Sequence, residues 1–423
     1  MAAHDRIRLT GPLQTRPRKG PRPSLETVGI VTSSLPRYTA VPHQAFTGVV
    51  SARILAAAVT AAALLLPASA SAGLRMNQVQ VIGTHNSYKR ETTPAERQMY
   101  DTLINTPGDY AQYLDYAHAS LANQLARQDV RGLELDLWPD PQGGLYANPF
   151  VRQKLGLGPL PNPEWTKPGT KLIHIADLDY NSSCIRLVSC LQQVRDWSKA
   201  HPRHLPVLIM LELKQSDPRA VAGGGVKAPP WDLAALESVE AEIRSVFRER
   251  DMVTPDDVRR RGETLEQSVL RHGWPSLDDA RGKVAFLMDN DPGPIRDAYT
   301  AGHPNLEGRV IFTNSRPGLP DAAFIKRNEP GGANTAQIQD LVRRGYLVRT
   351  RSDVPLTTIL SGDTTQIDAA LRSGAQLIST DFPEVGMSAR YDSDYVAEVP
   401  GGGTWRCNPV NAGWGCRGGA LER

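Results

Sequence analysis

Short runs of β-branched and aliphatic residues alternate with helical stretches along most of this chain. Eight runs have the length and bounding turn residues of buried strands. They lie at residues 79–85, 132–138, 171–175, 206–213, 283–289, 309–315, 346–352 and 376–382. Eight strands separated by helices in a chain of 423 residues predict an α/β fold, a (β/α)8 barrel of the TIM type, over residues 73–395.

Helical periodicity fills several of the gaps between these strands. The clearest helical segments are residues 94–104, 120–128, 186–200, 233–250 and 335–344. A further segment, 145–169, follows the second strand and has neither a helical nor a strand period. Loops that follow barrel strands lie on the catalytic face, so we expect this one to border the site. Its apolar side chains either make transient contact with a membrane surface or pack the loop down.

The segment "SARILAAAVTAAALLLPASASAG" has the three parts of a secretory signal peptide. Arg53 supplies the basic start, residues 54–66 the apolar stretch, and Ala70-Ser71-Ala72 the small-residue cleavage site. We therefore predict a signal peptide at 49–72, cleavage near Ala72 and a secreted, extracellular mature protein.

Residues 1–48 are rich in Pro, Arg and Ser and show no periodicity. They are predicted to be an over-extended or disordered N-terminus, with translation starting near Val49 or Val50.

The net charge of +3 is unevenly distributed. Residues 1–72 hold eight of the 48 Lys and Arg residues but only two of the 45 Asp and Glu residues, so the remaining body is slightly acidic. A nucleic-acid-binding domain would show a basic stripe instead. The composition therefore predicts no nucleic-acid partner, and we expect a monomer.

The four cysteines form two close pairs, Cys184 with Cys190 and Cys407 with Cys416. An even number in an exported chain favours two small disulfide loops, with sequential pairing expected among three possible connectivities. The alternative is a zinc site, for which these spacings are poor. The second pair lies in the Gly-rich segment 396–423, which is predicted to be a short disulfide-pinned C-terminal tail.

Polar side chains gather where the first four predicted strands end. They are His85 and Asn86 at the first strand, Glu134 and Asp136 in the second, His174 in the third, and Glu212 and Lys214 at the fourth. Buried carboxylates are costly unless they are paired or hold a metal. Three carboxylates and an amide offer the oxygen ligands that suit Ca²⁺, or less favourably Mg²⁺. Histidines beside such a cluster can act as acid and base near neutral pH.

The motifs "GTHNSY", "LELDLW", a later histidine and "PVLIMLEL", in this order, resemble the catalytic half of calcium-dependent phosphoinositide-specific phospholipase C. The stretch "LDYAHASLANQLARQDVRGLELDLWPD" is similar to the secreted bacterial branch of that phosphodiesterase superfamily. The resemblance is specific over about residues 79–215 and looser to 383.

The resemblance implies calcium ligands at Asn86, Glu134, Asp136 and Glu212, and catalytic histidines at His85 and His174. It implies a TIM barrel that cleaves phosphatidylinositol-type phospholipid to diacylglycerol and inositol cyclic phosphate by attack of the 2-hydroxyl. Glu134 is a candidate base for that hydroxyl, His174 for protonating the leaving oxygen and His85 for donating to the phosphate. The two histidine roles can be exchanged on the sequence alone.

Four basic residues are candidates for contact with substrate phosphate: Lys89, Lys214, Arg349 and Arg351. Arg349 and Arg351 share one face of the seventh predicted strand, and an ion pair near Asp353 explains them equally well.

Two other functions compete. A glycerophosphodiester phosphodiesterase shares the barrel, the E-x-D pair and an E-x-K strand like Glu212-Leu213-Lys214, but normally has His-Arg after the first strand. The pair His85-Asn86 therefore favours the phospholipase. A catalytically retired barrel that only binds a head group would have no evident use for the histidines and the metal ligands together.

Overall fold

The computed structural model describes residues 73–354 and 356–422. The predicted signal peptide at 49–72 and the N-terminal segment 1–48 lie outside these residues. Within the described part, no helix is long and apolar enough to cross a membrane.

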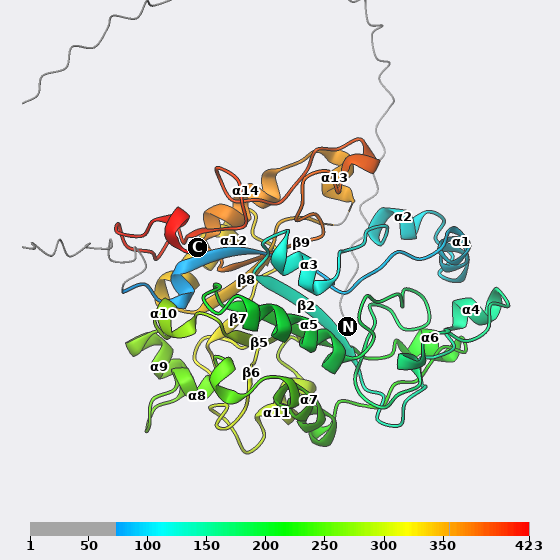
Figure 1. Cartoon of the computed structure of the whole chain (residues 1–423), viewed down its shortest axis with the longest axis horizontal. Helices are drawn as coiled ribbons and strands as arrows, with labels where there is room; N and C mark the ends of the chain where they lie inside the picture. The colour runs from blue at the N-terminus through cyan, green and yellow to red at the C-terminus, as the bar shows by residue number, and fades with distance from the viewer. Residues whose placement is uncertain (1–72, 355, 423) are drawn as a thin grey trace, which may run out of the picture. The chain divides into compact units, whose positions relative to one another are not determined.

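Eight parallel strands form the barrel wall, in the order β6-β5-β4-β2-β1-β9-β8-β7 (Figure 1). The strands are β1 (Val79–Thr84), β2 (Gly132–Trp138), β4 (Val207–Leu213), β5 (Val284–Met288), β6 (Ile311–Phe312), β7 (Phe324–Lys326), β8 (Leu347–Arg351) and β9 (Leu377–Thr380). A parallel bridge between Asn314 and Phe324 brings the two ends of this sheet together, so the barrel is nearly closed. The predicted TIM-type barrel is confirmed.

One of the eight predicted strands is wrong, and one strand of the wall was missed. In the predicted third strand only β3 (Lys171–Leu172) is extended, and it pairs antiparallel with the end of β2 instead of joining the wall. The wall instead includes β7, which has three residues. A strand of this length, set between turn residues, carries too few apolar positions to show a period.

The helices of the described part are α1 (Pro94–Leu103), α2 (Asp109–Tyr113), α3 (Leu121–Ala126), α4 (Phe150–Lys154), α5 (Leu187–Ala200), α6 (Pro218–Ala222), α7 (Leu233–Val246), α8 (Pro255–Val258), α9 (Leu265–His272), α10 (Leu277–Ala280), α11 (Pro294–Thr300), α12 (Ala333–Arg344), α13 (Thr357–Ser361) and α14 (Thr365–Ser373). All five helices expected from periodicity are present, as α1, α3, α5, α7 and α12, with ends that differ by a few residues. Thr93 begins α1 with a capping box, which stabilises the start of this helix.

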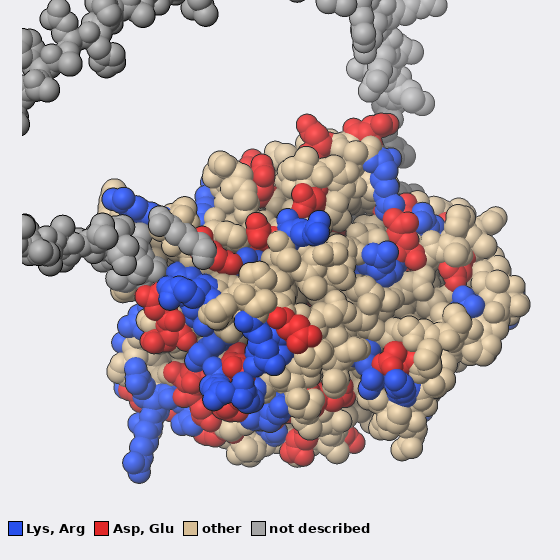
Figure 2. All heavy atoms as spheres, in the orientation of Figure 1, with Lys and Arg blue, Asp and Glu red and all other residues tan. Residues whose placement is uncertain are grey.

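The helices α1, α2, α4 and α6 gather on one side of the barrel, on the right in Figure 1, toward which the C-terminal end of β2 points. The segment 145–169 contributes α4 and a 3-10 turn at Pro163–Trp165, so it is more regular than its sequence suggested. This side carries few charged groups in Figure 2, whereas charges are dense over α8, α9 and α10.

The C-terminal tail packs at the opposite end of the barrel. Its strand β10 (Trp405–Cys407) pairs antiparallel with the start of β1 (Figure 1). Disulfides join Cys184 to Cys190 and Cys407 to Cys416, so the sequential pairing is confirmed and neither pair is a zinc site.

Glycines bring β1 and β2 unusually close together. Gly83 is aligned with Gly132, and a Cβ at Gly83 would lie 2.7 Å from the Cα of Gly132. A Cβ at Gly132 would lie 2.2 Å from a methyl group of Leu377, so that side chain fills the space that both glycines leave open. This contact sets the spacing of the two strands that carry the polar residues of the site.

A buried histidine before β4 makes the fold sensitive to acid. His204 is 1% exposed, and burial lowers its pKa to about 4. Below the ordinary pKa of about 6.5, the unfolded chain takes up a proton that the folded chain resists. The free energy of unfolding should therefore fall between pH 6.5 and pH 4, by about 3 kcal/mol for this residue alone.

Replacing His204 by Gln should remove that part of the pH dependence, because Gln can still reach Ser198 but does not titrate. Urea unfolding at pH 7.5 and pH 4.5 measures the difference. The exposed His272→Gln variant is the control and should keep the wild-type dependence. An equal acid loss in His204→Gln would show that His204 does not contribute.

Candidate active site

Three carboxylates converge at the C-terminal ends of β2 and β4. Glu134, Asp136 and Glu212 each offer an oxygen within 4.8 Å of the others. The register aligns Asp136 with Glu212, so both side chains face the same way, and Glu134 faces that side because it lies two residues earlier in β2. Glu134 and Asp136 are 2% and 0% exposed.

Asn86 adds a fourth oxygen to this cluster. Its φ of 47° lies in the left-handed region, which Asn tolerates better than most residues and which turns the chain out of β1. Its amide oxygen lies 3.3 and 3.2 Å from the two Asp136 oxygens, while its nitrogen donates to the Tyr116 hydroxyl at 2.8 Å. The reversed amide would donate to Asp136 instead. The reversed orientation satisfies both ends of the amide in the absence of a cation, and the first would let the amide oxygen share a bound cation with Asp136.

The pKa values of the carboxyl groups in the cluster also favour a metal site. Burial raises the pKa of Glu134 to about 7, although Arg349 opposes this, and burial raises the pKa of Asp136 well above its usual range despite Lys214. Carboxylates that are this hard to ionise are stabilised as anions by a divalent cation. Oxygen ligands from three carboxylates and one amide fit Ca²⁺.

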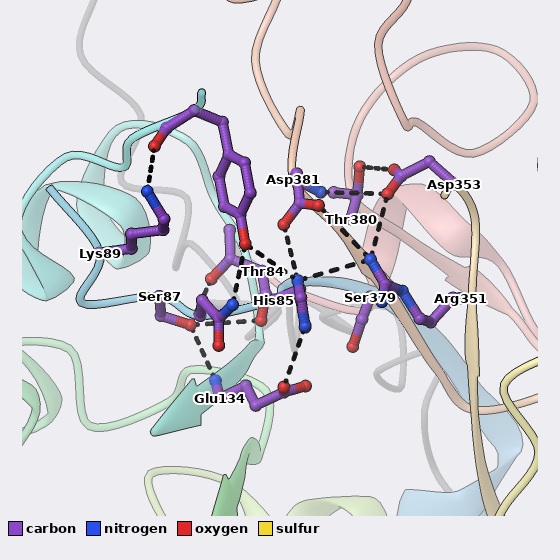
Figure 3. Close-up of polar contacts among 12 residues, drawn as sticks. Thr84, His85, Ser87, Lys89, Glu134, Arg351, Asp353, Ser379, Thr380 and Asp381 are labelled. Atoms are coloured by element: carbon purple, nitrogen blue, oxygen red, sulfur yellow. Dashed lines mark hydrogen bonds and ion pairs between the residues drawn. The ribbon is translucent and has the colours of Figure 1, made fainter. Parts of the chain in front are cut away.

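His85 lies beside Glu134 of the cluster, as Figure 3 shows. Its Nδ1 is 2.8 Å from Asp381, at the end of β9, and its Nε2 is 3.5 Å from Glu134. The Arg351 guanidinium approaches both Nδ1 and Asp381 to 3.4 Å. Burial, followed by the charges of Arg351 and Arg349, lowers the pKa of His85 well below its usual range.

His174 does not end a barrel strand as expected but lies in the loop after β3. Its Nδ1 is 2.9 Å from Asp179. Lys89 approaches the same carboxylate oxygen to 3.4 Å, and Lys89 together with His174 lowers the pKa of Asp179 even though burial opposes this. Burial lowers the pKa of His174, with Asp179 opposing.

The four basic residues expected to contact phosphate lie in different surroundings. Lys214 is 3.3 Å from Asp136 and 3.1 Å from Glu212, and these carboxylates raise its pKa although burial opposes them. Arg349 is buried and donates to Glu134 at 2.7 Å. Arg351 is partly exposed between His85 and Asp381.

Lys89 does not face the space in which substrate phosphate is expected to bind. Its side chain is 1% exposed, and its ammonium donates to the carbonyl oxygens of Leu114 and Tyr116 at 2.7 and 3.1 Å. Together with the ion pair to Asp179, these contacts use all of its donors, so Lys89 supports the position of His174 rather than facing phosphate.

Three residues of the site were not identified from sequence: Asp381, Asp179 and Tyr116. Asp381 lies next to the end of the last predicted strand, so a carboxylate near that strand end was an available signal. Asp179 lies in a loop, five residues after His174, and nothing in its spacing predicts the contact. Tyr116 comes from the segment between α2 and α3, and only the fold brings it to Asn86.

Residues 74–409 match the family model described as "Phosphoinositide phospholipase C, Ca2+-dependent". The chain belongs to this family. Its members are phosphodiesterases that act on phosphoinositides and depend on calcium, so calcium is the cofactor that the Asn86–Glu134–Asp136–Glu212 cluster is suited to hold.

Comparison with solved structures finds calcium-dependent phospholipases C of low sequence identity. The apo enzyme from a Pseudomonas species is 15% identical, with a TM-score of 0.49, covering 80% of this chain and 96% of that chain. The enzyme from Streptomyces antibioticus is 17% identical, with a TM-score of 0.45, covering 73% of this chain and 95% of that chain. Comparison with curated protein sequences finds no match.

If Glu212 is a calcium ligand of this phospholipase C, Glu212→Gln should raise the Ca²⁺ concentration for half-maximal activity by at least about 10-fold, because a charged ligand becomes neutral at nearly unchanged shape. Activity measured across a Ca²⁺ titration checks this. Asp340→Asn, on the exposed face of α12, is the matched control. A wild-type titration curve for Glu212→Gln would remove this residue from the ligand set.

Proposed function

We propose that this phospholipase C converts phosphatidylinositol-type phospholipid to diacylglycerol and an inositol cyclic phosphate. The proposal rests on the arrangement of side chains at the C-terminal ends of the barrel strands, which we call the mouth of the barrel. A four-oxygen cluster adjoins His85, and a second carboxylate-held histidine, His174, acts on the pKa of His85 through its charge. When bound, Ca²⁺ would lower the pKa of the attacking hydroxyl and offset the charge that develops on the phosphate.

Glu134 and His85 have separate roles next to the attacking 2-hydroxyl. Their Oε1 and Nε2 atoms face each other at 3.5 Å, so a ring 2-hydroxyl placed there contacts both. Glu134 accepts the hydroxyl proton. His85 donates a hydrogen bond from Nε2 to a phosphate oxygen. When the His85–Asp381 pair holds two protons, one lies between Nδ1 and Asp381 and the other is on Nε2, so Nε2 is a donor whether the shared proton is on the ring or on the carboxylate.

His174 serves the leaving group. Asp179 is kept ionised by Lys89 and lies 2.9 Å from Nδ1, which orients the ring and favours its protonated form. The opposite ring nitrogen then protonates the glyceride oxygen as its bond to phosphorus breaks. Lys214 and Arg351, two partly exposed cations at the mouth, are the proposed contacts for phosphate oxygens.

Phosphorus NMR of the mature protein with phosphatidylinositol in detergent micelles tests this function. A cyclic phosphodiester signal that requires Ca²⁺ and disappears with chelator is the expected result. Release of glycerol phosphate would favour a glycerophosphodiester phosphodiesterase. Binding of head group without turnover would favour a retired barrel.

The acid role of His174 predicts a dependence on the leaving group. With phosphatidylinositol, His85→Ala and His174→Ala should each lower the rate about 10²–10⁴-fold. With a nitrophenyl inositol phosphodiester, whose leaving group needs no proton, the His174→Ala loss should shrink while the His85→Ala loss remains. Steady-state rates on both substrates measure this. The opposite pattern would exchange the two roles.

Contact with a membrane surface is part of the proposal. Four exposed apolar side chains follow the strand ends at the mouth: Leu145 (39% exposed), Leu157 (48%), Val354 (37%) and Val385 (75%). By contrast, Trp165 of segment 145–169 is 3% exposed and packs inside. The mostly uncharged side of Figure 2 contains this segment, which suits a transient contact with lipid. Export also remains a proposal, because the predicted signal peptide lies outside the described residues.

Leu157→Asp should therefore lower activity on phosphatidylinositol vesicles several-fold and leave activity on a soluble inositol phosphodiester unchanged, because only the first requires contact with the lipid surface. Leu270→Asp, at a similarly exposed leucine (43%) of α9, should change neither. Equal losses on vesicles for both variants would contradict a specific role for the mouth.

A further inference from the structure

The part of the barrel mouth formed by β5 and β7 holds an ion pair that no step above uses. Asp289, the residue after β5, is 8% exposed, and its Oδ2 lies 2.9 Å from the ammonium of Lys326 in β7. Its other oxygen, Oδ1, is buried and has no hydrogen-bond partner among the described residues. A buried carboxylate oxygen without a donor is costly, so this atom requires an explanation.

The register places Asp289 beside the calcium cluster. Met288 is aligned with Leu211, so Asp289 continues the row that contains Asp136 and Glu212 and faces the same way.

Lys326 reaches the mouth from the other side of the same opening. It is aligned with Arg349 of β8, and the Arg349 guanidinium donates to Glu134 at 2.7 Å. The ion pair and the cluster therefore border one opening, with Glu134 and Arg349 between them.

Hydrogen bonds fix the segment that carries Asp289. Its amide donates to Leu211 at 2.9 Å, and the Asn290 side chain exchanges two hydrogen bonds with the backbone of Leu213, at 2.8 and 2.9 Å. The Asn314 side chain accepts from the amide of Lys326 at 3.0 Å. The free oxygen is thus held in place before any ligand arrives, as a recognition group should be.

We propose that Asp289 and Lys326 form a hydroxyl-binding subsite that recognises the far edge of an unphosphorylated polyol ring; this rests on the proposed function. Asp289 Oδ1 accepts a hydrogen bond from one ring hydroxyl, and the Lys326 ammonium donates to its neighbour. If the 1-phosphate and 2-hydroxyl lie at the cluster, the opposite ring edge carries the 4- and 5-hydroxyls.

The same pair disfavours a ring phosphate at that edge. A phosphate there would face the Asp289 carboxylate. The two nearby cations, Lys326 and Arg349, are already paired with Asp289 and Glu134. A phosphorylated ring therefore gains no unpaired cation and meets an anion, whereas a hydroxyl meets a vacant acceptor.

Kinetics of Asp289→Asn test the subsite. Rates are measured on phosphatidylinositol and its 4- and 5-phosphates in identical mixed micelles, with KM and kcat separated. Wild type should prefer the unphosphorylated lipid. Asp289→Asn should raise KM for phosphatidylinositol about 10-fold with little change in kcat, and should shift the kcat/KM ratio toward the phosphorylated lipids by at least about 10-fold.

Asp297→Asn is the control, because Asp297 in the neighbouring helix α11 is 66% exposed and pairs with Arg296 rather than with Lys326, and it should keep the wild-type ratio. Thermal unfolding verifies that each variant is folded, and Lys326→Met provides a second test if Asp289→Asn is not. An unchanged ratio in a folded variant, or a loss of stability alone, overturns the subsite.

Calorimetric titration with free myo-inositol distinguishes failure of the Asp289–Lys326 subsite from failure of the proposed function. Weaker binding to Asp289→Asn than to wild type supports the subsite even if no lipid is cleaved. Equal binding overturns the subsite even if phosphatidylinositol is cleaved.

Discussion

The cost of burying carboxylates at the barrel mouth determines much of this structure. Five acidic groups that are scarcely exposed lie at or near strand ends, and a cation from another part of the chain approaches each one. The pairs are Glu134 with Arg349, Asp136 with Lys214, Asp179 with Lys89, Asp289 with Lys326 and Asp381 with Arg351. Buried charges are tolerated only when paired in this way. The parallel register makes it possible, since it brings alternate residues of neighbouring strands to one opening.

The five pairs differ in the protonation of the carboxylate and in whether one of its oxygens lacks a donor. This difference gives the parts of the mouth distinct chemistry. Asp136 keeps a raised pKa beside Lys214 and lies next to the side-chain amide of Asn86, an arrangement suited to a metal site. Asp179 keeps a low pKa because its cation is fully buried with it, so it can support a protonated His174. Asp289 has one oxygen without a donor. One type of interaction therefore accounts for the three roles that we propose, in metal binding, in acid–base support and in recognition of the ring.

Sequence alone predicted the strands that are long enough to show a pattern and the polar residues that end them. It located β1, β2, β4 and β5, each of which has five or more residues, and with them the three carboxylates that the structure brings together. It failed where the local signal is short or the partner is distant. The three residues of β7 show no period, and the fold alone reveals that Lys89 is buried against Asp179. Ion pairs across a barrel mouth depend on register, which is not set by local sequence.

Glu134 connects the two halves of the mouth. Its Oε1 faces His85 and its Oε2 accepts from Arg349, whose strand neighbour Lys326 holds Asp289. Removing the Glu134 charge would leave Arg349 buried and unpaired, at a cost of several kcal/mol, and would disturb the calcium cluster and the ring-binding side together. Loss of activity at this position therefore could not be assigned to one role. Asp289 is the better probe of ring recognition because its Oδ1, which has no partner among the described residues, is the proposed acceptor for a ring hydroxyl, while Oδ2 is paired with Lys326.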